Sequence, residues 1–203
     1  MVITGDLTPA LADALLDATV IAVDTETSGL SWAEDHLLLC QLFSPSIGPV
    51  LVRNFTRRPE QLARVFRSPR VRKVFHFAPF DLRFIESQWG MEVRNVACTK
   101  AASKILDPEL PNSSHSLAQL TYRYLGVPLE KGAVRTSDWG AINLSDEQIN
   151  YAVSDVIHLP GLLSALTERL RVARRLSTWK AVCRYMPVDA RLQVHGTPNP
   201  LIY

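Results

Sequence analysis

The sequence predicts a single α/β domain, in which strands early in the chain form a mixed sheet and later helices flank it. The chain has 203 residues, enough for one full core, and its 47% hydrophobic and 21% charged residues are typical of a soluble globular protein. Short apolar runs separated by turn residues fill the first half, whereas helical patterns dominate the second. The same order of elements also fits an α+β arrangement.

Turn and capping residues define the elements of the first half. Thr8 followed by Pro9 is a helix-start pair that opens the helix PALADALLDA. Pro59 opens a second helix, PEQLARVFRS, and a third, APFDLRFIESQW, is expected to end at Gly90. The expected strands are residues 20–24, 37–43 and 49–53, followed by KVFHF and VRNVACT.

Helices account for most of the second half. KAASKIL follows the last expected strand, and the helix SLAQLTYRYL stops at Gly126. Ser145 and Gln148 form a capping box at the start of DEQINYAVSDVIHL. Pro160 and Gly161 should end or kink this helix, with LLSALTERLRVARRL continuing beyond them.

Composition excludes several classes of protein. No apolar run approaches the roughly 20 residues that span a bilayer, so no membrane association is expected. The N-terminus has neither a basic segment nor a cleavage site of a signal peptide. The three cysteines are widely spaced and outside any CxxC pattern, which makes disulfides and zinc unexpected and favours a cytoplasmic location.

Positive charge is concentrated in two runs, although the net charge is only +2. These runs are either solvated helix faces or surfaces that follow a phosphate backbone. The first run comprises Arg53, Arg57, Arg58, Arg64, Arg67, Arg70, Arg72 and Lys73, and the second comprises Arg169, Arg171, Arg174, Arg175, Lys180 and Arg184.

Two carboxylates at the end of an apolar strand are the first sign of chemistry. Asp24 and Glu26 follow the run VIAV with only Thr25 between them, so their side chains point to the same face of the strand. Like charges so close repel each other unless a cation lies between them. The pair therefore predicts a cation site, although Asp24 could instead cap a following helix.

Two further acids lie among apolar residues. Asp81 is surrounded by phenylalanines in FHFAPFDLRF, and Asp155 follows Tyr151 by four residues, on the same helix face. Alone, Asp81 could be a carboxylate at a helix N-terminus, and Asp155 could lie on a solvated stripe. Together with Asp24 and Glu26, however, they suit a hard divalent cation, Mg²⁺ or Mn²⁺.

The segments VDTETSGL, HFAPFDL and YAVSDVIHL resemble, in order and spacing, the three motifs of the DEDD superfamily of 3′–5′ exonucleases, with ribonuclease D as the closest subgroup. The resemblance extends over roughly residues 1–175 and includes the segments ACTKAASKIL and LSDEQINYAVSDV. It implies a compact form that consists of the catalytic domain only, with an exonuclease domain over residues 1–186 and a tail over 187–203. The end of that tail, HGTPNPLIY, is expected to be loosely held.

The resemblance also implies a fold and a mechanism. The fold would be ribonuclease H-like, with a mixed sheet of five or six strands. Two divalent cations would clamp the scissile phosphate, with Asp24 bridging both, Glu26 and Asp155 on the nucleophile side, and Asp81 serving the second. Asn150 stands where one branch of the superfamily has histidine, so Tyr151 would position the attacking water, as in the tyrosine branch.

The substrate implied by the resemblance is RNA, trimmed from its 3′ end with release of nucleoside monophosphates. Substrate contacts would come from Thr27, Leu30, His76 and Phe80, although for His76 the sequence favours a packed or solvated histidine over a substrate contact. The chain departs from the family at Phe77, where asparagine is common, and at residues 133–135, where glutamines are frequent. Single-stranded DNA remains an alternative substrate, and a short basic track predicts either weak binding or a homodimer.

Two other functions fit parts of the pattern. DTETS is a near match to the D-x-D-x-T motif of haloacid dehalogenase-like phosphatases, but the late acidic pair of that family is missing. A non-catalytic RNA-binding module could also use this fold. It would retain RNA binding without metal-dependent hydrolysis, although all four acids and the tyrosine are present.

Overall fold

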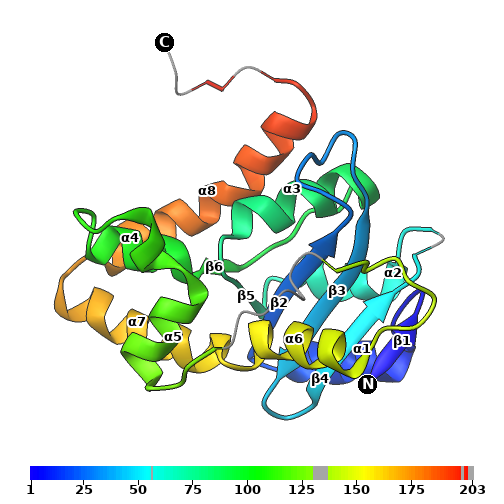
Figure 1. Cartoon of the computed structure of the whole chain (residues 1–203). Coiled ribbons are helices and arrows are strands. Elements are labelled where there is room, and N and C mark those ends of the chain that lie inside the picture. Colours follow the sequence, from blue (N-terminus) through cyan, green and yellow to red (C-terminus); the bar gives the residue numbers. More distant parts are fainter. Residues whose placement is uncertain (56, 130–136, 198, 201–203) are drawn as a thin grey trace.

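The computed structural model describes residues 1–203 except residues 56, 130–136, 198 and 201–203. The segment at residues 133–135, where the sequence departs from the family pattern, therefore lies outside the described residues. Three strands in the middle of the sheet form an antiparallel meander, and helices pack around it (Figure 1).

The sheet has six strands in the order β1-β4-β3-β2-β5-β6, so the predicted mixed sheet is confirmed. Strand β3 pairs antiparallel with both β2 and β4, while β1 with β4, β2 with β5, and β5 with β6 are parallel pairs. The strands are β1 Val2–Thr4, β2 Val20–Thr27, β3 Leu37–Ser44, β4 Gly48–Arg53, β5 Arg72–Phe75 and β6 Val96–Cys98. Strand β1 was not predicted, because three residues at a sheet edge carry too little pattern of their own.

The first seven helices follow the predicted order, and the eighth was not predicted as a separate element. They are α1 Pro9–Asp17, α2 Glu60–Arg67, α3 Ala78–Trp89, α4 Thr99–Leu106, α5 Leu117–Leu125, α6 Asp146–Ile157, α7 Leu159–Val172 and α8 Leu176–Val194, with a 3₁₀ turn at Asn112–His115. Both predicted caps form: the Thr8 hydroxyl accepts from the Leu11 amide, and Ser145 and Gln148 make a reciprocal capping box. The predicted break after α6 falls at His158, and Pro160 lies in the first turn of α7.

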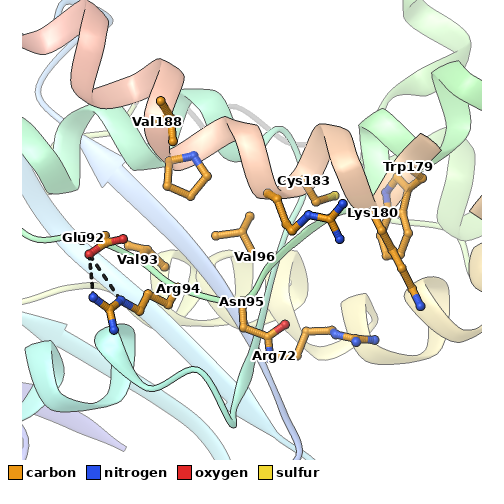
Figure 2. Close-up of a pocket in the computed structure, with 12 residues that line it drawn as sticks. Arg72, Glu92, Val93, Arg94, Asn95, Val96, Trp179, Lys180, Cys183 and Val188 are labelled. Carbon is orange, nitrogen blue, oxygen red and sulfur yellow. Dashed lines mark hydrogen bonds and ion pairs between the residues drawn. The ribbon is translucent and has the colours of Figure 1, made fainter. Parts of the chain in front are cut away.

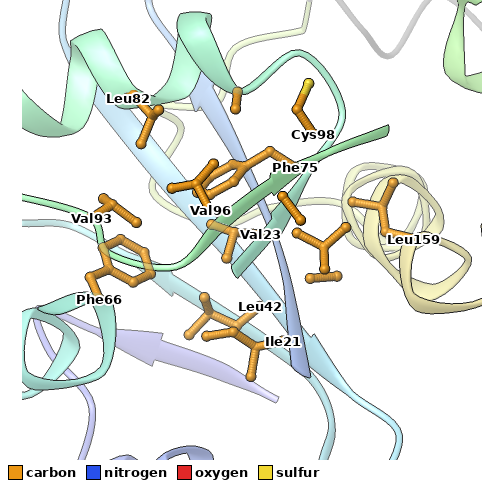
Figure 3. Packing of buried hydrophobic residues seen from close by; sticks show 14 of the residues in the cluster. Ile21, Val23, Leu42, Phe66, Phe75, Leu82, Val93, Val96, Cys98 and Leu159 are labelled. Carbon is orange, nitrogen blue, oxygen red and sulfur yellow. The ribbon is translucent and has the colours of Figure 1, made fainter. Parts of the chain in front are cut away.

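Alternation along the strands divides the buried residues between the two faces of the sheet. Most apolar strand residues join the main core, in which Ile21, Val23 and Leu42 lie near Phe66 and Phe75 (Figure 3). On the other face, a smaller cluster joins Leu39 and Leu51 of the sheet to Trp139, Tyr151 and Ala152. Helix α6 is thus held against the sheet by its own apolar cluster, and this packing fixes the position of its polar residues.

Helix α8 crosses the expected boundary between residues 186 and 187. It begins at Leu176 after Arg174, which has a positive φ of 56°, and continues through Pro187 to Val194. Met186 and Ala190 are buried on either side of that boundary, and α8 packs against α3. The helix therefore extends as one element into the segment expected to be a tail, because its buried face continues there.

The first basic run does not form one surface. Arg53 is 4% exposed and donates to the carbonyl of Ala141, and Lys73 is fully buried, so neither residue belongs to a solvated face or a phosphate track. Among the described residues, no helix is long and apolar enough to cross a membrane.

Candidate active site

Three of the predicted acids meet where α6 packs over the sheet. Asp24 and Glu26 project from β2, and Asp155 projects from the third turn of α6. One carboxylate oxygen from each of the three lies within 4.8 Å of the other two. Such a set of oxygen donors, drawn from two elements far apart in sequence, fits a hard divalent cation.

Asp81 lies beside this cluster but does not belong to the group of three. It is on the first turn of α3, is 3% exposed, and accepts a 2.8 Å hydrogen bond at Oδ1 from the Thr25 hydroxyl. Thr25 alternates with Asp24 and Glu26 along β2, so β2 contributes both the paired acids and the partner of Asp81.

Electrostatic repulsion in the site is strong. Burial, and then the charges of Asp81, Asp155 and Glu26, raise the pKa of Asp24 well above its usual range. Burial also raises the pKa of Asp81 to about 7, although the Thr25 hydrogen bond and the nearby Arg83 act in the opposite direction. Four acids packed together in this way favour either protonation or a bound cation.

Tyr151 faces the same acids, whereas Asn150 is exposed to solvent. Tyr151 is 9% exposed, and its ring lies 6.0 Å from that of Trp139, centroid to centroid. Burial, followed by the charges of Asp155 and Glu26, raises the pKa of the phenol. The hydroxyl therefore keeps its proton and can donate a hydrogen bond at neutral pH.

The segment that carries Trp139 is fastened to α6 by Gln148. The Gln148 side-chain nitrogen donates to the Ser137 hydroxyl and to the carbonyl of Asp138, both at 3.0 Å. The same side chain accepts from the Ser145 amide at 2.8 Å. One buried glutamine thus caps α6 and holds Trp139 against Tyr151.

Gln41 is a residue of this site that the sequence analysis missed. It is fully buried on β3, opposite Asp24 in the strand register, and its Nε2 donates to Oε1 of Glu26 at 3.3 Å. The signal was a lone polar side chain in the apolar run LLLCQLF. Its meaning depends on the pairing of β2 with β3, which a single strand does not reveal.

The four predicted substrate residues differ in their surroundings. Leu30 is 82% exposed, while the Thr27 hydroxyl donates to the carbonyl of Gly29 at 2.6 Å. His76 shares a 2.9 Å hydrogen bond with the hydroxyl of Thr99 through Nδ1, and Phe80 is half-buried, with its ring 5.0 Å from that of Phe84.

Phe77, the point of departure from the family pattern, has an unusual conformation. It precedes α3 with a φ of +80°, in the left-handed region that a bulky side chain rarely adopts. Its ring is 43% exposed, and the ammonium group of Lys100 lies 4.7 Å from the ring centre. Strain of this kind is often kept at functional sites, and here it leaves an aromatic ring exposed four residues before Asp81.

Comparison with known proteins shows which family the chain resembles. A family described as 3′–5′ exonuclease matches residues 1–171. Ribonuclease D of Haemophilus influenzae is 31% identical over 156 residues, which are 75% of this chain and 37% of that protein. The chain thus spans little more than a third of the length of this relative.

Solved structures of Brucella melitensis NrnC match over the full length of the chain. One, with bound Mg²⁺, is 28% identical with a TM-score of 0.87 and covers 100% of this chain and 98% of the other. A second, bound to pGG, is 28% identical with a TM-score of 0.88 and covers 100% and 97%. The family match also overturns the phosphatase interpretation of DTETS. The chain therefore belongs to the family described as 3′–5′ exonuclease.

Proposed function

We propose that this protein is a metal-dependent 3′–5′ exoribonuclease that releases nucleoside monophosphates from RNA 3′ ends in the cytoplasm. The observation that carries the proposal is the cluster of Asp24, Glu26 and Asp155, whose oxygens lie within 4.8 Å of one another beside Tyr151. Three free, buried cysteines are in keeping with a reducing compartment.

The proposed chemistry assigns a role to each residue of the site. When bound, divalent cations (Mg²⁺ or Mn²⁺) would neutralise the charge of the scissile phosphate and lower the pKa of the attacking water. Asp24, Glu26 and Asp155 would hold one cation, and Asp81 would serve a second. The Tyr151 hydroxyl, which stays protonated, would orient the water by hydrogen bonding. Gln41 is a positioning residue, since its amide fixes one oxygen of Glu26.

RNA is the proposed substrate because one group of relatives, ribonuclease D, is named for action on RNA. A solved structure of NrnC from Brucella melitensis is bound to pGG. Short oligoribonucleotides are therefore the first substrates to test. The exposed Leu30 and Phe77 offer apolar and aromatic surfaces on which bases could stack.

Two alternative functions are distinguished by the assay described below, and the oligomeric state is tested separately. Single-stranded DNA could be the main substrate, since the 2′-hydroxyl contacts that distinguish RNA are not defined by the acids. The protein could instead bind RNA without cleaving it. A homodimer would extend the binding surface of a chain this small, and a sedimentation run would detect it.

The test is a nuclease assay on 5′-labelled single-stranded RNA and DNA of one sequence, with Mg²⁺, Mn²⁺ or EDTA. We expect a ladder that shortens from the 3′ end of RNA in either metal and disappears in EDTA. Asp155→Asn should abolish the ladder, whereas Asp146→Asn, an exposed acid on the same helix, should not. Stronger cleavage of DNA would favour the first alternative, and binding of RNA without cleavage in any metal would reject the enzyme.

A further inference from the structure

Some members of the two basic runs, which are about a hundred residues apart in the sequence, line two neighbouring cavities. Arg72, at the start of β5, lines a cavity of about 450 Å³ together with Lys180 and Arg184 of α8 (Figure 2). A second cavity of about 660 Å³ contains Arg70 and Arg171. Arg72 and Asn95 line both cavities, so the two hollows adjoin. We call this surface the basic groove and define it by Arg70, Arg72, Lys180 and Arg184.

Most of this positive charge is not compensated. Glu92 pairs with Arg94 at 3.1 Å, and Glu168 pairs with Arg171, so both acids of the two cavities are already engaged. Across the described part of the chain, none of the four defining residues has an ion pair. Lys180 and Arg184 are moreover four residues apart on one helix face, where like charges destabilise the helix. A cluster of cations without ion-pair partners favours an anionic ligand.

The groove is separate from the acidic cluster. Arg72 is opposite Val20, the first residue of β2, whereas Asp24 and Glu26 are on the second half of that strand. Four to six residues of extended strand correspond to about 13–20 Å. A dinucleotide seated on the acids would be too short to reach the groove, but a longer strand would not.

We propose that the basic groove binds the phosphate backbone of single-stranded RNA, upstream of the nucleotides that reach the acids; this inference rests on the proposed function. The cations are spread along two adjoining hollows, as a chain of phosphates requires, rather than gathered into one cage. Lys180, Arg184 and Arg70 are exposed, and the floor beneath them contains the buried Val93, Val96 and Trp179. The groove therefore raises affinity for long RNA without taking part in hydrolysis.

The test compares RNA affinity with dinucleotide cleavage in the full chain. Binding of a labelled single-stranded RNA of about 20 nucleotides is measured by fluorescence anisotropy in EDTA across a salt series. The variants are Lys180→Gln and Lys180→Gln/Arg184→Gln. The matched control is Lys104→Gln, which removes another exposed helix lysine that lines neither cavity. Hydrolysis of pGG in Mg²⁺ is measured for the same proteins.

We expect the double variant to bind the long RNA about tenfold more weakly at low salt, with a salt slope reduced by about 1.4, since each single-strand phosphate contact contributes about 0.7. Lys180→Gln should show about half the loss of slope, and Lys104→Gln none. Cleavage of pGG should be unchanged throughout. Equal RNA affinity in all variants would overturn the inference, as would a change in sedimentation mass of the double variant, which would make the groove a subunit contact. Absence of pGG cleavage in every protein, with the binding difference intact, would instead count against the proposed enzyme alone.

Discussion

Asp24 lies among the other acids of the site and is exposed to the charge of each of them. Burial raises its pKa most, and the charges of three other acids raise it further. Burial also raises the pKa of Asp81 to about 7. A carboxyl group whose pKa is higher in the folded than in the unfolded state favours folding when it is protonated. The fold of the metal-free protein should therefore lose stability as pH rises from about 4 to about 7.

Asp24→Asn should stabilise the metal-free protein at neutral pH, because it removes a half-buried charge that repels three others. We expect the midpoint of thermal unfolding in EDTA to rise by about 2–4 °C at pH 7.5, equivalent to about 1 kcal/mol, and by less at pH 5. Calorimetry at both values of pH would measure it. Addition of Mg²⁺ should stabilise the natural protein more than the variant. An Asn variant that unfolds at a lower temperature than the natural protein in EDTA would refute this reasoning.

The acids could be predicted from the sequence because each interrupts an apolar element, which local pattern reveals. Gln41 and Thr25 could not, since their roles depend on which strand or helix lies opposite them. Phe77 was noticed only as a departure from the family. Its exposed ring and left-handed backbone result from the turn between β5 and α3, and the residue type alone does not predict them.

Helix α6 is the element that joins stability to the site. Its buried face packs on Leu39 and Leu51, and the same helix carries both Tyr151 and Asp155. Its N-terminus depends on Gln148, which closes the capping box and also fastens the segment with Trp139. A change at Gln148 should therefore affect the free energy of unfolding through the capping box. It should affect the catalytic rate through the contacts to the segment with Trp139.

Gln148→Ala should lower the free energy of unfolding by about 1–2 kcal/mol, through loss of the cap and of buried hydrogen bonds. Gln148→Glu is the informative comparison. Its carboxylate can still accept from the Ser145 amide, but it cannot donate to Ser137 or Asp138. We expect Gln148→Glu to retain most of the stability of the natural protein. Both variants should show a reduced kcat and a nearly unchanged KM. Urea unfolding and steady-state kinetics would measure both, and full activity in Gln148→Glu would exclude a positioning role.

At the level of elements, the sequence predicts a helix end wherever a capping residue or a glycine marks it. Helices α1, α3, α5 and α6 begin or end at Thr8, Gly90, Gly126 and Ser145, as expected. Helix α8 was missed as a separate element, because the chain turns at Arg174 with no glycine to mark the turn and because Pro187 lies within the helix. Packing of α8 on α3 supplies what the local sequence lacks.

The stability of the whole molecule also depends on a lysine buried at the centre of its parallel strands. Lys73 on β5 is fully buried between Ile21 of β2 and Val96 of β6 in the sheet. Its ammonium group donates to the carbonyls of Ser68 and Val71 at 2.5 and 2.9 Å. Burial, and then the charge of Arg94, lower its pKa to about 7.

Because the pKa of Lys73 is depressed in the fold, the unfolded chain binds more protons between pH 7 and 10.5. The free energy of unfolding should therefore rise with pH over this range, by at most about 1.4 kcal/mol per pH unit from this group. Lys73→Met should remove that part of the slope. Urea unfolding of both proteins at several values of pH would measure the two slopes. In the difference between them, the contributions of cysteine and tyrosine titration cancel. Parallel slopes would show that Lys73 keeps an ordinary pKa.

The acids of the site come from β2, α3 and α6, which lie in the first, middle and last parts of the described chain. During synthesis, β2 leaves the ribosome long before Asp155 does, and a growing chain that lacks α6 has only part of its acidic cluster. Until α6 has been made and has docked on the sheet, the growing chain would lack Asp155 in its acidic cluster and would be inert as a nuclease.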